Sequence, residues 1–591
     1  MKYIGRFLNK KELIILRVGL IVFFASIIFM GAHFYYTHLE IVPSQGEKYI
    51  EGIVGSPKYI NPLYASANDA DSDISSLVYS SLYKRNQKGD LTADLALGMD
   101  RSKDNLTYNI KIKNNVIWHN GSPLTVDDII FTFNAIKETN YHSPLRISFS
   151  GVEIEKVDEQ NIKFILTQPY APFQELLTFG ILPQEQWLQI PPASANLAAI
   201  NLKPIGSGPF LFKSLIKDKV GNIKSITLSR FDGYYGQLPY LDEIIFKFYV
   251  SSGETVAALN NSEIAGISFL PKGDQKDILS ADSLNIYELN IPQLTAIFLN
   301  KKNNQALGDK NIRKALALAI DKKEIVNEIF AGKYKIVDGP ILQNSFAYNS
   351  NIKKYAFNKS EAEKILDQAG WKIKNVSKEM AAEAEKNINS KNEDEKAEAE
   401  QILKVGEGNW RVRQNKKIDD FLSINFVSID TSDNYLVAEK IKKFWETIGI
   451  RTLVEIVPAM QIQTDIIKPR EFDALFYGQI LGADPDEYAF WHSSQAGDNG
   501  LNISDFSNKE TDQLLEDGRT VSDEKIRKEK YFKFQEIITE EVPAIFMYSP
   551  TYTYVQTKKV KGYSTTGIVS PKDRFSDVFN WYIKTQGKII W

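Results

Sequence analysis

The stretch DNLTYNIKIKNNVIWHNGSPLTVDDIIFTFNAIK, which spans residues 104–137, carries the most information about the fold. Its first third alternates apolar and polar residues, which predicts a half-buried strand over 108–112. The aromatic pair Trp118-His119 and an Asn-Gly-Ser-Pro turn follow. Thr125 then begins a helix with two aspartates in its first turn and apolar residues at helical spacing after it. A strand, a turn and a capped helix in this order indicate an α/β fold.

The same kinds of element recur along the rest of the chain without a fixed repeat. Ser360 and Glu363 have the spacing of a capping box, which predicts a helix start at Ser360. Another helical face, over 435–448, stops at Gly449 and is followed directly by a strand pattern over 450–457. That order of helix, glycine and strand is an α/β unit, so the chain is predicted to form mixed α/β lobes rather than a solenoid.

Size and composition fit a large folded protein with two or more lobes. The chain has 591 residues, of which 43% are hydrophobic and 12% aromatic. Many tyrosines and phenylalanines suit the lining of a cleft for an organic ligand, although a large aromatic core has the same composition. The net charge is −3, which gives no sign of a nucleic-acid-binding surface.

The sequence contains no cysteine and only five histidines. The absence of cysteine excludes disulfides, thiol nucleophiles, thiolate metal sites and a lipid-modified N-terminal cysteine. None of the histidines has the spacing of a zinc-binding motif, so we expect neither a metal site nor a cofactor.

An apolar segment near the N-terminus predicts a membrane helix. Residues 18–36 are apolar except for Ser26 and His33, which is just long enough to span a bilayer. The preceding lysines and arginines place Met1 in the cytoplasm. A cleaved signal peptide is the alternative, but Met30-Gly31-Ala32 is a poor cleavage site.

We therefore expect an uncleaved signal anchor in the cell membrane, with the bulk of the chain outside the cytoplasm. It divides into a basic cytoplasmic tail over 1–12, a transmembrane segment over 13–36 and a linker over 37–48.

Residues 375–417 break the pattern, because they are rich in alanine, glutamate and lysine and show little apolar periodicity. Such blocks usually face water, so we interpret this one as a charged insertion that is either helical or flexible. A docking role for a transporter or a surface partner is the alternative.

Several further motifs follow one another along the chain: 61–64, 78–96, 204–210, 231–236, 241–244, 311–321, 483–486, 490–493, 527–543 and 559–562. Each is weak alone, but their order is specific. Together with the opening stretch they resemble the family 5 extracellular solute-binding proteins, the peptide-binding subunits of ATP-driven importers. The resemblance covers most of 47–563.

The resemblance implies a two-lobed α/β fold of the periplasmic-binding-protein type (type II, with an extra subdomain), preceded by one transmembrane helix. It assigns the core of lobe I to 49–75, 200–295 and 546–591. It assigns the extra subdomain to 76–199 and lobe II to 296–545. It also implies a monomer that captures peptides between the lobes and delivers them to a permease with its ATPase.

A peptide carries an ammonium group, which a buried carboxylate can bind selectively in a closed cleft. Members of the family typically use an aspartate in the late pocket segment, which here spans 476–486. The resemblance makes Asp484 the first choice for this role and Asp486 the second, although the better-known oligopeptide binders place the acid further from the proline. Alternatively, both aspartates cap the following helix or turn.

Other candidate ligand residues lie near this segment or in earlier motifs. Alternation along the strand at 476–479 predicts that one of its faces reaches the cleft. An aromatic side chain after the loop could stack on a ligand or could belong to the core. These candidates are Tyr477, Gln479, Trp491, His492, Trp118 and Tyr64. No partner for the ligand carboxylate can be assigned.

Three rival functions remain open. An extracellular hydrolase needs a nucleophile with its base or two separated carboxylates, and no such motif is present. A membrane-anchored sensor would use the same fold without transport. A receptor for a nickel chelate, haem or an oligosaccharide would keep the transport role and change the ligand.

Overall fold

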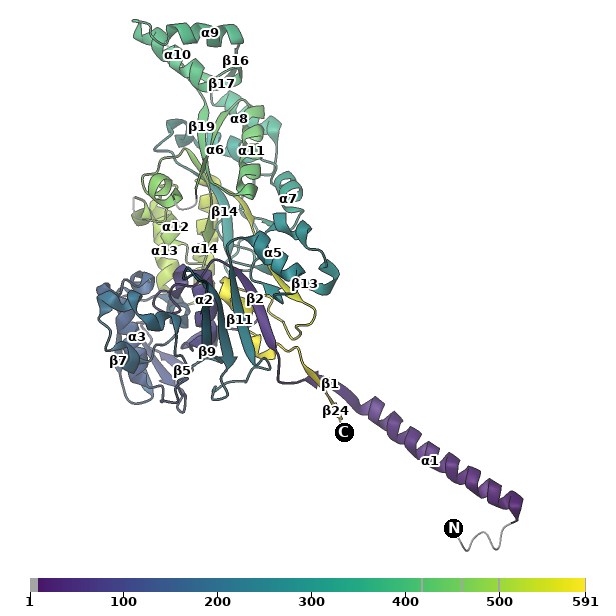
Figure 1. The fold of residues 1–591 in the computed structure, drawn as a ribbon. Coiled ribbons are helices and arrows are strands. Elements are labelled where there is room, and N and C mark those ends of the chain that lie inside the picture. Colours follow the sequence, from purple (N-terminus) through teal and green to yellow (C-terminus); the bar gives the residue numbers. More distant parts are fainter. Residues whose placement is uncertain (1–8, 416–417, 459–460, 498–499, 590–591) are drawn as a thin grey trace.

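The computed structural model describes residues 9–415, 418–458, 461–497 and 500–589. It contains two α/β lobes, a subdomain attached to the first, a small unit at the far end of the second and a long N-terminal helix (Figure 1). Lys2 and Arg6, which belong to the expected cytoplasmic tail, lie outside the described residues.

Lobe I is built on a seven-stranded mixed sheet. Its central strand, β2, runs parallel to both neighbours, β11 and β12, and the remaining pairs are antiparallel. Helices α2 (Asp69–Val78) and α5 (Ser252–Asn260) pack against it. In spatial order the strands are β13 (Leu284–Asn290), β23 (Thr551–Thr557), β12 (Gly266–Ile267), β2 (Lys48–Val54), β11 (Glu243–Tyr249), β10 (Ile223–Arg230) and β9 (Phe210–Lys217).

The subdomain contains the stretch that opens the sequence analysis. The expected strand is β6 (Thr107–Ile112), and the expected helix is α3 (Val126–Lys137) with Thr125 and Asp128 forming a capping box. Both predictions are confirmed. The subdomain sheet has the strand order β5 (Ala96–Arg101), β6, β8 (Asn161–Leu166) and β7 (Val152–Lys156).

Lobe II has a six-stranded sheet covered by helices. The predicted α/β unit is confirmed, because α11 (Ser432–Thr447) leads through Gly449 into β20, which runs parallel to β19. The strand order is β15 (Lys335–Ile336), β22 (Ala544–Ser549), β14 (Gln293–Leu299), β21 (Ala474–Ile480), β19 (Ser423–Ile429) and β20 (Arg451–Val457). The other long helices are α6 (Lys310–Leu318), α7 (Lys322–Phe330), α8 (Lys359–Gln368), α13 (Lys509–Thr520) and α14 (Glu524–Glu541). The predicted capping box at Ser360 is wrong, because the N-cap of α8 is Asn358, which accepts from the N–H of Glu361.

The chain crosses between the two large sheets at two neighbouring places. It leaves lobe I after β13 and enters lobe II with β14, and it returns from β22 to β23. Because β13 pairs with β23 and β14 pairs with β22, the two crossings lie side by side. Such paired connections are suited to a hinge between lobes.

The turn at 204–210 is held against the end of α2. A Cβ on Gly206 would lie 1.9 Å from the carbonyl oxygen of Val78, so glycine is required by the close approach of two backbones. Gly206 N–H donates to Nδ1 of His119, and Nε2–H of His119 donates to the carbonyl of Gly208. Burial lowers the pKa of His119 to about 4, so the ring is neutral and serves the turn.

The charged insertion forms a compact unit at the far end of lobe II (Figure 1). Helices α9 (Lys378–Asn387) and α10 (Glu393–Val405) pack on the three strands β16 (Lys372–Val376), β17 (Gly408–Asn415) and β18 (Ile418–Phe421). Its small core includes Ala384, Ile402 and Trp410. The segment is therefore a folded helical insertion rather than a flexible one.

The N-terminal helix α1 (Lys10–His38) projects away from the body, and none of its residues is buried (Figure 1). It is the helix among the described residues that is long and apolar enough to cross a membrane. The segment expected as a linker, 37–48, is mostly regular structure: the helix runs to His38 and β1 (Leu39–Pro43) follows at once, paired with β24 (Thr585–Ile589).

The core of lobe I encloses a charged cluster. Arg574 binds both Glu51 and Asp73, and all three side chains are at most 1% exposed. The hydroxyl groups of Tyr49 and Tyr554 also donate to Glu51. Every charged group in the cluster therefore has a partner, although the two carboxylates outnumber the one guanidinium.

Candidate functional site

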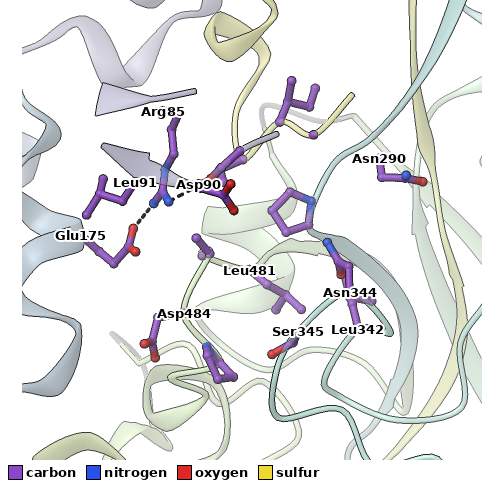
Figure 2. A pocket seen from close by; sticks show the side chains of 18 of the residues that line it. Arg85, Asp90, Leu91, Glu175, Asn290, Leu342, Asn344, Ser345, Leu481 and Asp484 are labelled. Carbon is purple, nitrogen blue, oxygen red and sulfur yellow. Dashed lines mark hydrogen bonds and ion pairs between the residues drawn. The ribbon is translucent and has the colours of Figure 1, made fainter. Parts of the chain in front are cut away.

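A cavity of about 500 Å³ lies between the lobes (Figure 2). Lobe I and its subdomain contribute 85–91, Glu175 and 566–569. Lobe II contributes residues from 341–345 and 481–487, and Asn290 and Pro292 lie where the chain crosses between the sheets. A volume of this size is within the range of roughly 300–1,000 Å³ that is usual for ligand sites.

The subdomain wall is a tight hairpin between β3 (Tyr83–Arg85) and β4 (Leu91–Ala93). The side chain of Asn86 accepts hydrogen bonds from the N–H groups of Lys88 and Asp90, which fixes the turn. Arg85 forms an ion pair with Glu175 and donates to the carbonyl of Gly89, as Figure 2 shows. The hairpin thereby presents Arg85, Lys88 and Asp90 at the cavity.

A second loop of lobe I supports this hairpin. Thr566 N–H donates to the carbonyl of Gln87 over 2.8 Å. A Cβ on Gly567 would lie 2.2 Å from the carbonyl oxygen of Lys88, so the two loops touch through their backbones. The cavity wall on this side is therefore built from two segments that are held together by contacts between main chains.

The lobe II wall is the loop that follows β21. Arg527, on α14, binds both carboxylate oxygens of Asp484 at 2.9 and 2.5 Å. Arg519, on α13, binds Asp486 at 3.0 Å. Asp486 also accepts a hydrogen bond from the N–H of Tyr488, the first residue of α12 (Tyr488–Trp491), although the N-cap of that helix is Glu487.

Glu487 is the third acid of this loop and has no cationic partner among the described residues. Its side chain is 3% exposed, it lines the cavity, and its Oε2 atom accepts no hydrogen bond within the described residues. Burial, followed by the nearby charge of Asp486, raises the pKa of Glu487 well above its ordinary value, and the indole of Trp491 opposes the rise. Burial also raises the pKa of Asp484, but the ion pair with Arg527 opposes that change.

Two contacts join the lobes on either side of the crossing strands. The guanidinium of Arg519 lies 5.3 Å from the ring centroid of Tyr170, which belongs to the subdomain. Lys333 of lobe II forms a 2.5 Å ion pair with Glu288 of β13 in lobe I. The cavity therefore lies between lobes that are in contact with each other.

Of the eight predicted ligand residues, only Asp484 lines this cavity. Trp118 and Trp491 are each 1% exposed and lie in hydrophobic cores, where Trp491 packs against Phe298 and Phe546. Tyr64 is buried in lobe I beside Tyr59. These aromatic side chains follow the core alternative that their size favours.

The remaining predicted residues also lie outside the cavity lining. Tyr477 and Gln479 are on β21, a strand paired on both sides, and Gln479 is 5% exposed. His492 stacks on Tyr488 with 4.1 Å between ring centroids and bonds to Ser494. Asp486 is engaged with Arg519 and the start of α12.

Sequence reasoning missed most of the cavity wall. The turn at 86–90 lies within the motif over 78–96, but nothing in the local sequence indicates that it faces another lobe. Glu487 directly follows Asp486, and this position is the local signal that could have made it a candidate. Across the described ranges, no group of three or more metal-binding side chains comes together.

Comparisons with known proteins agree with this architecture. The family model "Bacterial extracellular solute-binding proteins, family 5 Middle" matches residues 90–500. The oligopeptide-binding protein AppA of Bacillus subtilis is 29% identical over 548 residues, which is 92% of each chain.

Two solved structures extend the comparison. The structure of Bacillus subtilis AppA with a nonapeptide has a TM-score of 0.69 and 26% identity, and the match covers 92% of this chain and 100% of that one. NikZ of Campylobacter jejuni with Ni(L-His) has a TM-score of 0.71 at 23% identity over 90% of this chain and 99% of that one, which is a likeness of fold. The chain belongs to the family 5 bacterial extracellular solute-binding proteins.

Proposed function

We propose that this protein is the substrate-binding component of an ATP-driven importer and that it captures peptides in the cavity between its lobes. The observation that carries this proposal is the cavity of about 500 Å³ whose walls come from both lobes of a family 5 fold. The paired crossings between the sheets supply a hinge, so opening of the lobes would admit the ligand and closure would retain it.

Peptides are favoured as the ligand because the related AppA holds a nonapeptide. The ammonium group of a peptide needs a buried carboxylate, and two acids of the loop at 484–487, Asp484 and Glu487, line the cavity. Asp484 and Asp486 already bind arginines, whereas Glu487 has no cationic partner among the described residues. Glu487 is therefore our first choice for the ammonium partner, and Asp484 becomes its neighbour in the wall.

The same wall argues against hydrolysis. A peptidase needs a nucleophile with a base, or a metal with its ligands, beside the substrate. The described lining contains no histidine, and Asp484 is bound on both oxygens by Arg527. Binding without bond cleavage accounts for these residues.

We further propose that α1 remains in the membrane and that the lobes lie outside the cytoplasm as a monomer. A 29-residue helix is about 44 Å long at 1.5 Å per residue, which exceeds the hydrocarbon core of a bilayer. A permease and its ATPase would receive the ligand from the closed lobes.

Native mass spectrometry of the purified full-length protein tests this function. We expect added mass that matches co-purified peptides, and we expect peptides recovered after incubation to keep their length. Shortened peptides would establish a hydrolase. A protein that binds no peptide from a mixed pool, but retains a metal chelate, would replace peptide with another solute.

A further inference from the structure

The end of α1 continues directly into a two-stranded ribbon. The helix ends at His38, and Leu39 is the first residue of β1, so no flexible segment separates them. All five residues of β1 pair with β24, from Leu39 opposite Ile589 to Pro43 opposite Thr585. Figure 1 shows this ribbon at the joint between the body and α1.

The two faces of the ribbon differ in character. Directly opposed residues of an antiparallel pair point to the same face. One face therefore carries Leu39, Ile41, Pro43, Thr585, Gly587 and Ile589, and the other carries Glu40, Val42, Gln586 and Lys588. A Cβ on Gly587 would lie 2.7 Å from Cδ1 of Leu39, which places the leucine side chain across the glycine on the apolar face.

The apolar face has no cover within the described chain. Ile41 is 73% exposed and Ile589 is 37% exposed. On the other face, Glu40 and Lys588 lie opposite each other as a pair of unlike charges suited to water. Exposed β-branched residues confined to one face of a ribbon indicate a surface that is covered by something else.

The ribbon is also fixed to lobe I, so it cannot turn away independently. Ser44 N–H donates to the carbonyl of Lys584 at 3.0 Å, which continues the pairing of the two strands. Gly46 N–H then donates to the carbonyl of Tyr240 in lobe I at 2.9 Å. On the other strand, Tyr582 and Lys561 exchange two backbone hydrogen bonds of 2.9 Å. Two connections rather than one therefore link the helix to the body.

We propose that the apolar face of the β1–β24 ribbon lies in the outer interface of the lipid bilayer, as a second membrane contact beside α1. The inference rests on the proposed anchor. Tyr36, which is expected at the interface, is only three residues before Leu39, and three helical residues rise about 4.5 Å. The strand then extends about 17 Å at most, so its apolar face starts at the boundary where lipid can cover it.

The bilayer explains both faces of the ribbon. Interfacial burial removes Ile41 and Ile589 from water, while Glu40 and Lys588 stay hydrated on the opposite face. A β-ribbon that lies on the membrane would hold lobe I at a set height and tilt, which a single flexible connection would not do.

Single-cysteine variants provide the test, and the natural sequence has no cysteine to remove. The full-length protein is reconstituted in lipid nanodiscs that carry a nitroxide near the headgroups. Ile41→Cys, on the apolar face, and Glu40→Cys, on the charged face, are each labelled with the same small fluorophore. We expect the label at position 41 to be quenched about threefold more than the label at position 40, as one-sided interfacial burial requires.

A third variant, Ser26→Cys, is labelled with the same fluorophore and measured in nanodiscs whose lipids carry a nitroxide deep in the acyl chains. Its quenching reports whether α1 lies in the membrane. If the label at position 26 is quenched but the labels at positions 40 and 41 are quenched weakly and equally, α1 is in the membrane and the proposed ribbon contact is overturned. A label at position 41 that is shielded from water but not quenched by lipid would assign the face to a protein partner and would also overturn it. An unquenched label at position 26 would remove the anchor and the proposal together.

Discussion

Two buried groups of acids and arginines can be compared in this molecule. In the core of lobe I, Arg574 binds Glu51 and Asp73, and two tyrosine hydroxyls complete the cluster. In the cleft loop of lobe II, Arg527 and Arg519 each bind one aspartate. Both clusters contain one more carboxylate than arginine, but the additional carboxylate has different surroundings in the two.

The lobe I cluster shares one arginine between two acids and is sealed from solvent. The cleft loop gives each aspartate its own arginine. Glu487 lies beside the cavity and has no cationic partner among the described residues. A buried carboxylate without a partner is costly in its charged form, which agrees with the raised pKa of Glu487, and a ligand ammonium would supply the missing partner. The lobe I cluster therefore stabilises one lobe, whereas the cleft loop has one acid left over for the proposed ligand.

The largest effect is expected from Arg574→Met. The substitution leaves Glu51 and Asp73 buried without a counter-charge, which costs about 3–5 kcal/mol in the free energy of unfolding. Denaturant unfolding of the variant measures it, with Arg146→Met at an exposed position as the matched control. A loss no greater than that of the control would mean that the cluster does not stabilise lobe I.

The pH dependence of stability gives a second test of the lobe I cluster. Burial raises the pKa of Asp73 from its ordinary 3.8 to about 6, although Arg574 opposes the rise. The folded state therefore binds this proton more tightly than the unfolded state, and stability is gained as the pH falls from about 6 towards 4. Asp73→Asn cannot bind this proton, so its stability lacks the gain. The free energy of unfolding of the wild type minus that of the variant should therefore increase by up to about 3 kcal/mol as the pH falls from about 6 to 4. A flat difference would show that Asp73 is already ionised in this range.

The cleft loop is tested by a pair of isosteric variants, each titrated with a free-amine peptide and with its N-acetylated counterpart. Glu487→Gln should lower the affinity for the free-amine peptide more than about tenfold, because the buried ammonium loses its partner. The affinities for the free-amine and the acetylated peptide should then become similar. Asp484→Asn leaves Arg527 unpaired, so it should lower both affinities alike and reduce stability. If only Asp484→Asn loses the preference for the free-amine peptide over the acetylated one, Asp484 rather than Glu487 binds the ammonium.

The smallest effect is expected far from both clusters. Val376 and Gly408 are paired at the end of the β16–β17 ladder, so an Asn-Gly turn can replace 377–407 and remove α9 and α10. Peptide affinity should stay within about twofold, since the buried apolar residues of the removed helices, as far as the structure describes them, belong to the core of their own unit. A larger loss would tie the insertion to the cleft.

Local features could be predicted from the sequence because their causes are local. Thr125 caps α3 through contacts only three residues away, and Gly449 ends α11 immediately before a strand. The apolar segment of α1 and the order of the motifs likewise need no knowledge of distant contacts. These signals were sufficient for the fold class and the family.

The site depended on long-range pairing that no local pattern shows. Asp484 and Asp486 are neutralised by arginines 43 and 33 residues away, which leaves Glu487 as the unpaired acid. Trp491 is buried because Phe298 and Phe546 come from strands on other parts of the chain. The expected linker became a strand because Ser44 and its neighbours meet a segment about 542 residues later.

The central claim is that a guest occupies the cavity between the lobes, and Ala483→Trp tests it most directly. Ala483 lines the cavity and is exposed, so the larger side chain fills the space without displacing the core. Calorimetric titration with a peptide that the wild type binds should show affinity reduced by a factor of about 100 or more with unchanged unfolding, while Ala382→Trp on the insertion binds normally. Undiminished binding by Ala483→Trp would contradict the account.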